Sequence, residues 1–216
     1  MIYIYLLIIL IAAVAGGSLP VFFKSVHPAV MTYLLAFTGA FLFGITILHL
    51  IPETFNILGA KAGIYIVLGF FLQVILQQLS HGMEHGHVQP PAAPSHLPAS
   101  SLLLGLSVHA FMEGLPLGYH YADAAVLPSL VTGIAAHKFP EAFTLMSLFV
   151  LSGKKKMNKT LVLSLFALVT PVAALLALYL GNHFAWLPGV LIYVIAIVTG
   201  AFLHISTTIF YESGSK

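Results

Sequence analysis

Long apolar segments separated by short polar ones run through the whole chain. Seven of them hold roughly the 20 mostly apolar residues that a membrane-crossing helix needs. They cover residues 2–23, 32–56, 62–80, 100–122, 126–151, 160–181 and 186–211. This pattern predicts an all-α, polytopic helical membrane protein with seven transmembrane helices, in which residues 1–216 form one transmembrane domain. The first segment, "MIYIYLLIILIAAVAGG", has no basic residue and no clear cleavage site, so we interpret it as a span and not a removed signal peptide.

Two polar segments interrupt the pattern. Residues 81–100 are rich in His and Pro and are predicted to be a loop, and residues 152–159 form a short basic loop. If the N-terminus lies outside, Lys61 is the only lysine on the outer side and Lys138 lies within a span. The remaining six lysines then face the cytoplasm: Lys24, Lys154, Lys155, Lys156, Lys159 and Lys216. Because basic residues concentrate on the cytoplasmic side, this orientation is the predicted one, and it places the His-rich loop in the cytoplasm.

The composition supports a membrane protein and excludes several kinds of chemistry. Hydrophobic residues make up 60% of the chain and charged residues only 6%, against about 25% charged residues in soluble domains. There is no Cys, which excludes disulfides and thiolate metal sites. There is also no Arg, so no bidentate arginine clamp for phosphate or carboxylate exists. A net charge of +2 without a basic arm argues against nucleic acid as a partner.

Two of the predicted spans carry ionisable residues near their middle. His109 and Glu113 are four residues apart, and so are His137 and Glu141, so each pair shares one helix face. The two spans are consecutive and joined by a short loop, which makes them antiparallel neighbours. Two imidazoles and two carboxylates are therefore predicted to face one point.

This set of side chains suits a divalent transition metal. Imidazole with carboxylate fits Zn, Fe, Mn, Co or Cd, whereas Mg and Ca prefer oxygen alone. A charged side chain at the centre of a membrane helix costs about 3 kcal/mol on insertion scales, and a dication would neutralise both carboxylates. Pro116 and Pro140 lie beside the pairs and are expected to free the carbonyls of Met112 and Ala136, as in the broken helices of transporters.

Several motifs resemble those of the ZIP (Zrt/Irt-like) family of divalent-metal transporters. "HAFMEGLPLG" and "HKFPEAFTL" are similar to the fourth and fifth helix motifs of that family, and "HLIPE" (residues 49–53) to the second. "TPVAALLALYLG" and "TGAFLHISTTIFYE" resemble its sixth and seventh helices. The resemblance implies uptake of metal into the cytoplasm, mainly zinc, and an outside N-terminus. By motif position the transported metal would bind to His109, Glu113, His137 and Glu141.

The chain departs from the family pattern in two ways. Some members bind two metals with a polar residue after each His, where this chain has Ala110 and Lys138. A protonated ammonium cannot be a ligand, so we expect one metal, with Lys138 at the second position paired to a carboxylate. Family members usually have eight spans, whereas seven are predicted here.

Other polar residues are candidates for a pathway through the membrane or for binding metal in the loop. The candidate pathway residues are His49, Glu53, His120, Asp123, His204 and Glu212. For His120 with Asp123 an ordinary interfacial loop is the competing interpretation, and for His49 with Glu53 a structural network. The candidate metal-binding residues of the loop are His81, Glu84, His85 and His87.

The predicted function is transport of a divalent transition metal, with zinc as transported substrate, no organic cofactor and no catalytic residue. The expected location is a plasma or inner membrane, and the expected partners are metal ions and lipid, with a homodimer left open. Two alternatives remain: an intramembrane metal-dependent hydrolase, and a metal sensor without transport. The hydrolase is disfavoured because the chain lacks both HExxH and GxSxG motifs and because four protein ligands leave little room for an activated water.

Overall fold

The computed structural model describes residues 1–22, 28–79, 99–121, 123–151 and 158–214, and their regular structure is entirely helical. The helices are α1 (Ile2–Phe22), α2 (Pro28–Ile45), α3 (Ile51–Leu58), α4 (Lys61–Leu79), α5 (Ala99–Gly114), α6 (Val126–Leu151), α7 (Lys159–His183) and α8 (Leu187–Gly214). A π-helical segment, η1 (Thr46–Leu50), joins α2 to α3, and a 3-10 segment, η3 (Leu115–Gly118), extends α5. Since α2, η1 and α3 follow one another without a break, the described residues form seven continuous helical rods, which confirms the predicted helical membrane fold.

Five rods are long and apolar enough to cross a membrane, as judged over the described residues. These are α1, the α2–η1–α3 rod, α4, α7 and α8. The other two are α5 with η3, which is a shorter apolar helix, and α6. They are the two rods that carry the paired His and Glu residues.

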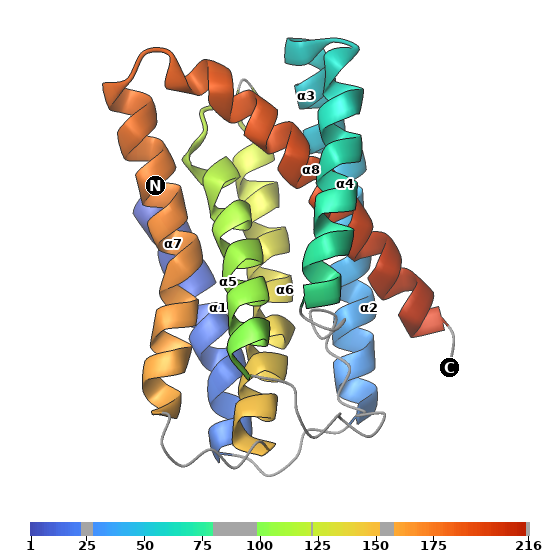
Figure 1. Cartoon of the computed structure of the whole chain (residues 1–216), viewed down its shortest axis with the longest axis vertical. Helices are drawn as coiled ribbons and strands as arrows, with labels where there is room; N and C mark the ends of the chain where they lie inside the picture. The colour runs from blue at the N-terminus through green and yellow to red at the C-terminus, as the bar shows by residue number, and fades with distance from the viewer. Residues whose placement is uncertain (23–27, 80–98, 122, 152–157, 215–216) are drawn as a thin grey trace.

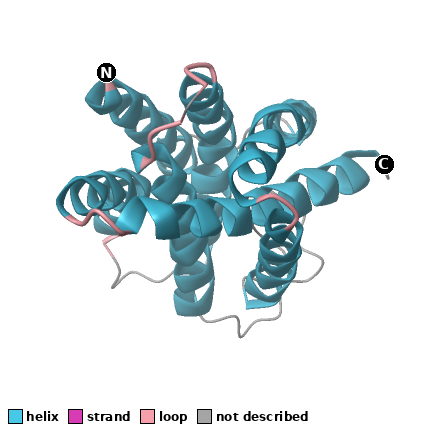
Figure 2. Ribbon diagram, turned by 90° about the horizontal axis from the view of Figure 1, so that it is seen from above, coloured by secondary structure: helices cyan, strands magenta, loops and turns pink. Residues whose placement is uncertain are grey.

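The rods divide into two neighbourhoods with α8 between them (Figure 1). One contains α1, α5, α6 and α7, and the other contains α2, α3 and α4. Helix α1 packs along α6 and also touches α7, while α7 packs on α5 and η3. On the other side α4 and α2 both pack against α8, and α2 also reaches α6. Figure 1 shows α8 running diagonally across the molecule, and Figure 2 shows it lying across the bundle when seen from above.

Close helix crossings are made where a glycine meets a backbone. A Cβ atom on Gly69 of α4 would lie 1.8 Å from the carbonyl oxygen of Ile197, and one on Gly200 of α8 would lie 1.8 Å from that of Ile66. On α1, a Cβ atom on Gly16 would lie 2.1 Å from the carbonyl oxygen of Phe139. Small residues that let helix backbones touch are the usual means of helix packing in lipid, where burial of apolar groups gives no advantage.

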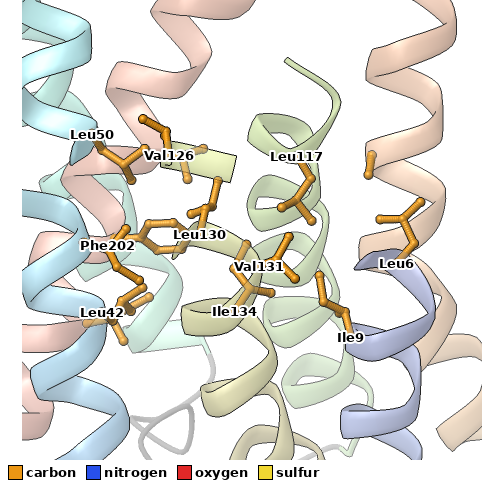
Figure 3. Close-up of a cluster of buried hydrophobic side chains, with 14 of the residues drawn as sticks. Leu6, Ile9, Leu42, Leu50, Leu117, Val126, Leu130, Val131, Ile134 and Phe202 are labelled. Carbon is orange, nitrogen blue, oxygen red and sulfur yellow. The ribbon is translucent and has the colours of Figure 1, made fainter. Parts of the chain in front are cut away.

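The largest apolar cluster among the described residues lies where α1, α2, η1, η3, α6 and α8 meet. Its labelled members in Figure 3 include Leu42, Leu50, Leu117, Leu130 and Phe202. These side chains are almost fully buried. The cluster holds the two neighbourhoods together around the polar residues of α5 and α6.

Candidate metal site

The first half of the site comes from α5. His109 and Glu113 lie one turn apart on the same face, as the sequence predicts, and Nε2 of His109 is 2.6 Å from Oε1 of Glu113. Glu113 is fully buried and His109 is 3% exposed. A charged carboxylate buried in a membrane helix is costly, and such groups usually pair with other polar or charged groups.

The second half comes from α6. Nδ1 of His137 donates a hydrogen bond to the carbonyl oxygen of Gly133 at 3.0 Å, because a carbonyl can only accept. This bond orients the imidazole and directs its Nε2 to the other side, where it contacts Oε1 of Glu113. Metal-ligating histidines are typically held in the same way: one ring nitrogen donates to a carbonyl, and the other is directed at the metal position.

Four buried side chains thus converge on one point: His109, Glu113, His137 and Glu141. One possible ligand atom from each lies within 4.8 Å of all the others. The two imidazole nitrogens directed at one carboxylate oxygen leave a position between them that a shared proton or a metal ion can occupy. The arrangement therefore fits a divalent metal bound by nitrogen and oxygen.

Lys138 occupies the far side of the two carboxylates. Its Nζ lies 2.6 Å from Oε2 of Glu113 and 2.6 Å from Oε2 of Glu141, and the side chain is 1% exposed. The ammonium also stands over the ring of Phe166 on α7, 5.2 Å from its centroid. The ammonium is therefore enclosed within the helix bundle.

The two oxygens of Glu113 therefore have different partners. Oε1 faces the two imidazoles, and Oε2 faces the ammonium of Lys138. In Glu141, Oε2 binds the same ammonium, whereas buried Oε1 has no hydrogen-bond partner among the described residues. Each carboxylate is thus left with one oxygen that is not committed to Lys138, and a buried oxygen of this kind is a natural position for a ligand atom.

Helix α7 supports the site although it supplies none of the four residues. The hydroxyl of Thr170 donates to the carbonyl oxygen of Ala110 at 2.9 Å, beside His109. One turn further along, α5 approaches α7 so closely that a Cβ on Gly114 would lie 2.4 Å from the carbonyl oxygen of Thr170. The sequence placed Thr170 in a helix motif but gave no reason to expect this bond. A contact between a threonine and a glycine on different helices does not change the spacing of apolar residues, so the sequence alone does not reveal it.

The two prolines affect their helices differently. Pro116 marks the point where α5 ends and the tighter η3 begins. Pro140 lies inside α6, which continues to Leu151. Its own carbonyl oxygen accepts a hydrogen bond from the hydroxyl of Thr144 at 2.9 Å.

The candidate pathway residues occupy separate places. His49 lies in η1 and is half-buried, and Glu53 follows on α3 and is 8% exposed. His120 is exposed beyond η3. Asp123 is exposed, and its Oδ1 accepts from the backbone nitrogen of Ala125 at 2.8 Å, which stabilises the start of α6.

His204 lies between α4 and α8, away from the four converging residues. Its Nε2 is 2.5 Å from Oε1 of Gln77, and its ring centroid is 4.8 Å from that of Phe70. The side chain of Glu212 lies outside the described residues. So do the candidate loop residues His81, Glu84, His85 and His87.

The fold and the site together define a class of protein: a helical membrane protein with a buried His/Glu site suited to a divalent metal. Comparison with known families agrees, because the ZIP zinc transporter family matches residues 80–210, which include α5, α6, α7 and most of α8. The chain belongs to this family. The "HLIPE" stretch at residues 49–53 precedes the matched part.

Curated relatives carry the same family name. The chain is 32% identical over 126 residues to "Zinc transporter ZIP9" of Xenopus tropicalis, an alignment that covers 57% of this chain and 41% of the relative. "Zinc transporter ZIP9" of Micropogonias undulatus is 32% identical over 126 residues, covering 57% of this chain and 40% of the relative. The chain thus spans about two fifths of the curated relatives that it matches.

Proposed function

We propose that the protein transports divalent transition-metal ions, zinc first among them, across a membrane into the cytoplasm. The metal would bind His109, Glu113, His137 and Glu141 on its way. The observation that carries the proposal is the convergence of these four buried side chains within 4.8 Å. The names of the curated relatives and the family match support zinc as the substrate.

The proposed site holds one metal ion at a time. Nζ of Lys138 contacts Oε2 of Glu113 and Oε2 of Glu141, where a second ion would otherwise need to bind. An ammonium in that place repels a second dication and leaves each carboxylate one oxygen for the first. Zinc, iron, manganese, cobalt and cadmium all accept two nitrogens and two oxygens, so the ligand set does not choose among them.

The proposed orientation has the N-terminus outside, with transport by alternating access or through a gated channel. A hydrolase is the less suitable candidate. If all four side chains bind the metal, neither carboxylate is left over as the general base that a metal-activated water requires.

The direct test is zinc accumulation by cells or liposomes that contain the protein. Wild type should accumulate radioactive zinc, while Glu113→Ala and Glu141→Ala should reduce accumulation to the level of membranes without the protein. Each change removes a charged ligand that the remaining three side chains cannot replace. Normal uptake by the double variant would show that the metal does not pass through this site.

A matched control uses two histidines. His109→Ala should abolish uptake, whereas His183→Ala should not. His183 is exposed at the end of α7, and its Nδ1 donates to the carbonyl oxygen of Tyr179 at 2.8 Å. Size-exclusion profiles of all variants separate loss of a ligand from loss of the fold.

A further inference from the structure

An apolar layer separates the proposed metal site from the end of the molecule where α3 ends and α6 begins, called the outer end below. We define this layer by Leu50, Leu117, Val126, Leu130 and Phe202, none more than 1% exposed. Figure 3 shows their side chains gathered among α5, α6, α8 and the rod that contains η1.

The layer lies directly above the four converging residues. Phe202 touches His137, with ring centroids 6.4 Å apart. Leu130 and Val126 precede His137 on α6 and lie about 10 and 16 Å from it along the helix axis, at 1.5 Å per residue. An ion arriving from the outer end would therefore meet these buried apolar side chains before it reached the site.

A polar group lies on the outer surface of this layer. Glu53 follows Leu50 by three residues on the same rod and is 8% exposed. Tyr121 follows Leu117 by four residues, and its ring packs against the layer. Glu53 lies within electrostatic range of both Tyr119 and Tyr121, whose rings contact each other at 5.2 Å between centroids.

The hydroxyl of Tyr121 is the feature that calls for a binding partner. It is buried and has no hydrogen-bond partner among the described residues. Leaving a buried hydroxyl unpaired costs about 1–3 kcal/mol, whereas a bound water or the water shell of an ion would satisfy it. The π-helical segment η1 directly precedes this place, and such segments occur frequently at functional sites.

We propose that Glu53, Tyr119 and Tyr121 form an outer waiting site for a hydrated divalent cation, on the outer side of the apolar layer. The carboxylate supplies the attraction, and the two hydroxyls bond to water molecules of the ion. The ion keeps its water here and loses it only at the inner site. The role of this site as a waiting position for transported metal rests on the proposed function and its direction. The binding of a cation by these three residues does not depend on either.

Terbium luminescence tests the site without any transport. Tb³⁺ prefers oxygen ligands and emits strongly when a nearby tyrosine absorbs ultraviolet light, so Tyr119 and Tyr121 would act as antennae. The measurement uses purified protein carrying Glu113→Ala and Glu141→Ala, which removes the inner carboxylates. Sensitised emission should appear on this background and fall by at least about tenfold when Glu53→Gln is added, since each 1.4 kcal/mol of lost attraction is tenfold in affinity.

The control removes an equal charge nearby. Asp123→Asn keeps an oxygen to bond the nitrogen of Ala125 and lies exposed on the same end of the molecule. The emission should persist in this variant. Emission that survives Glu53→Gln, or that falls equally with Asp123→Asn, would overturn the proposal, because the signal would then reflect general surface charge.

Transport kinetics provide a second test of the outer site. Glu53→Gln and Tyr121→Phe should each raise the zinc concentration for half-maximal uptake, by about five- to tenfold for Glu53→Gln, with maximal uptake changed less than about twofold. A collapse of maximal uptake at unchanged half-saturation would instead assign Glu53 to the folding or movement of α3. If no variant and no wild type takes up zinc, the proposed function fails while the terbium result still decides the outer site.

Discussion

At the scale of single residues, the site is organised around Glu113. One of its oxygens contacts the imidazoles and the other contacts the ammonium of Lys138, so this carboxylate lies between the proposed metal position and the lysine. The sequence predicts the pairing of His and Glu by spacing alone. It also predicts Lys138 beside a carboxylate, but its contact with both carboxylates and with Phe166 depends on how α5, α6 and α7 are packed.

Replacing the buried ammonium should make the protein more dependent on metal. In Lys138→Met the two carboxylates lose their shared cation, and removing one partner of a buried ion pair typically costs about 3–5 kcal/mol. With a chelator present, the melting temperature should fall well below that of wild type. Added zinc should raise the melting temperature of the variant by more than that of wild type, because the metal then meets two unshared charges.

Lys159→Met, at the start of α7 and outside the site, is the control and should respond to zinc as wild type does. A zinc-induced shift in Lys138→Met no larger than in wild type would contradict the role given to Lys138. Lys138→Asp extends the test, since it should raise the bound metal from one to two ions per chain by elemental analysis.

At the scale of elements, the sequence predicts the spans well and their irregularities poorly. The segment 126–151 matches α6 at both ends, and 62–80 matches α4 to within one residue at each end. The segment 32–56 gave no sign of the π-helical turn at Thr46–Leu50, because an extra residue in a turn leaves the apolar character unchanged. Similarly, the predicted span 100–122 gave no sign that the chain tightens into η3 (Leu115–Gly118) beside Pro116.

The contact between α5 and α7 leads to a prediction about stability. Gly114→Ala would bring a Cβ to 2.4 Å from the carbonyl oxygen of Thr170, and Gly118→Ala would bring one to 2.5 Å from that of Ala174. Both should destabilise the protein, by about 1–3 kcal/mol, because two helix backbones must separate. Thermal unfolding in detergent, followed by circular dichroism, measures the effect.

Gly189→Ala provides the opposite case on α8. Nothing lies within 4 Å of a Cβ built there, and alanine is the better helix former by about 0.5–1 kcal/mol. This variant should be as stable as wild type or slightly more stable. If all three variants lost stability equally, the glycines would be acting through helix propensity and not through the crossing with α7.

At the scale of the whole molecule, the lysine distribution predicts an orientation that cysteine labelling can test. The chain has no Cys, so a single introduced thiol is the only one present. Ala60→Cys lies in the turn between α3 and α4, and Asn158→Cys lies just before α7 at the opposite end. Both positions are exposed.

In intact cells, a maleimide that cannot cross the membrane should label Ala60→Cys and leave Asn158→Cys unlabelled until the cells are opened. This result follows if the N-terminus lies outside, as the excess of lysine on the other side indicates. The reverse labelling pattern would invert the proposed direction of transport. Labelling of both residues in intact cells would show leaky membranes and calls for a cytosolic marker protein as a reference.

The permanent ammonium of Lys138 has an electrical consequence for a site that alternates between the two faces of the membrane. If no proton replaces the metal between the imidazoles and Glu113, two carboxylates and one ammonium leave the empty site with a single negative charge, and a bound dication turns it into a single positive charge. A voltage that is negative inside then draws the loaded site inward and pushes the empty site outward, at about 2.3 kcal/mol per charge for each 100 mV. Both halves of such a cycle would run downhill in the same electric field, and neither would need a companion ion.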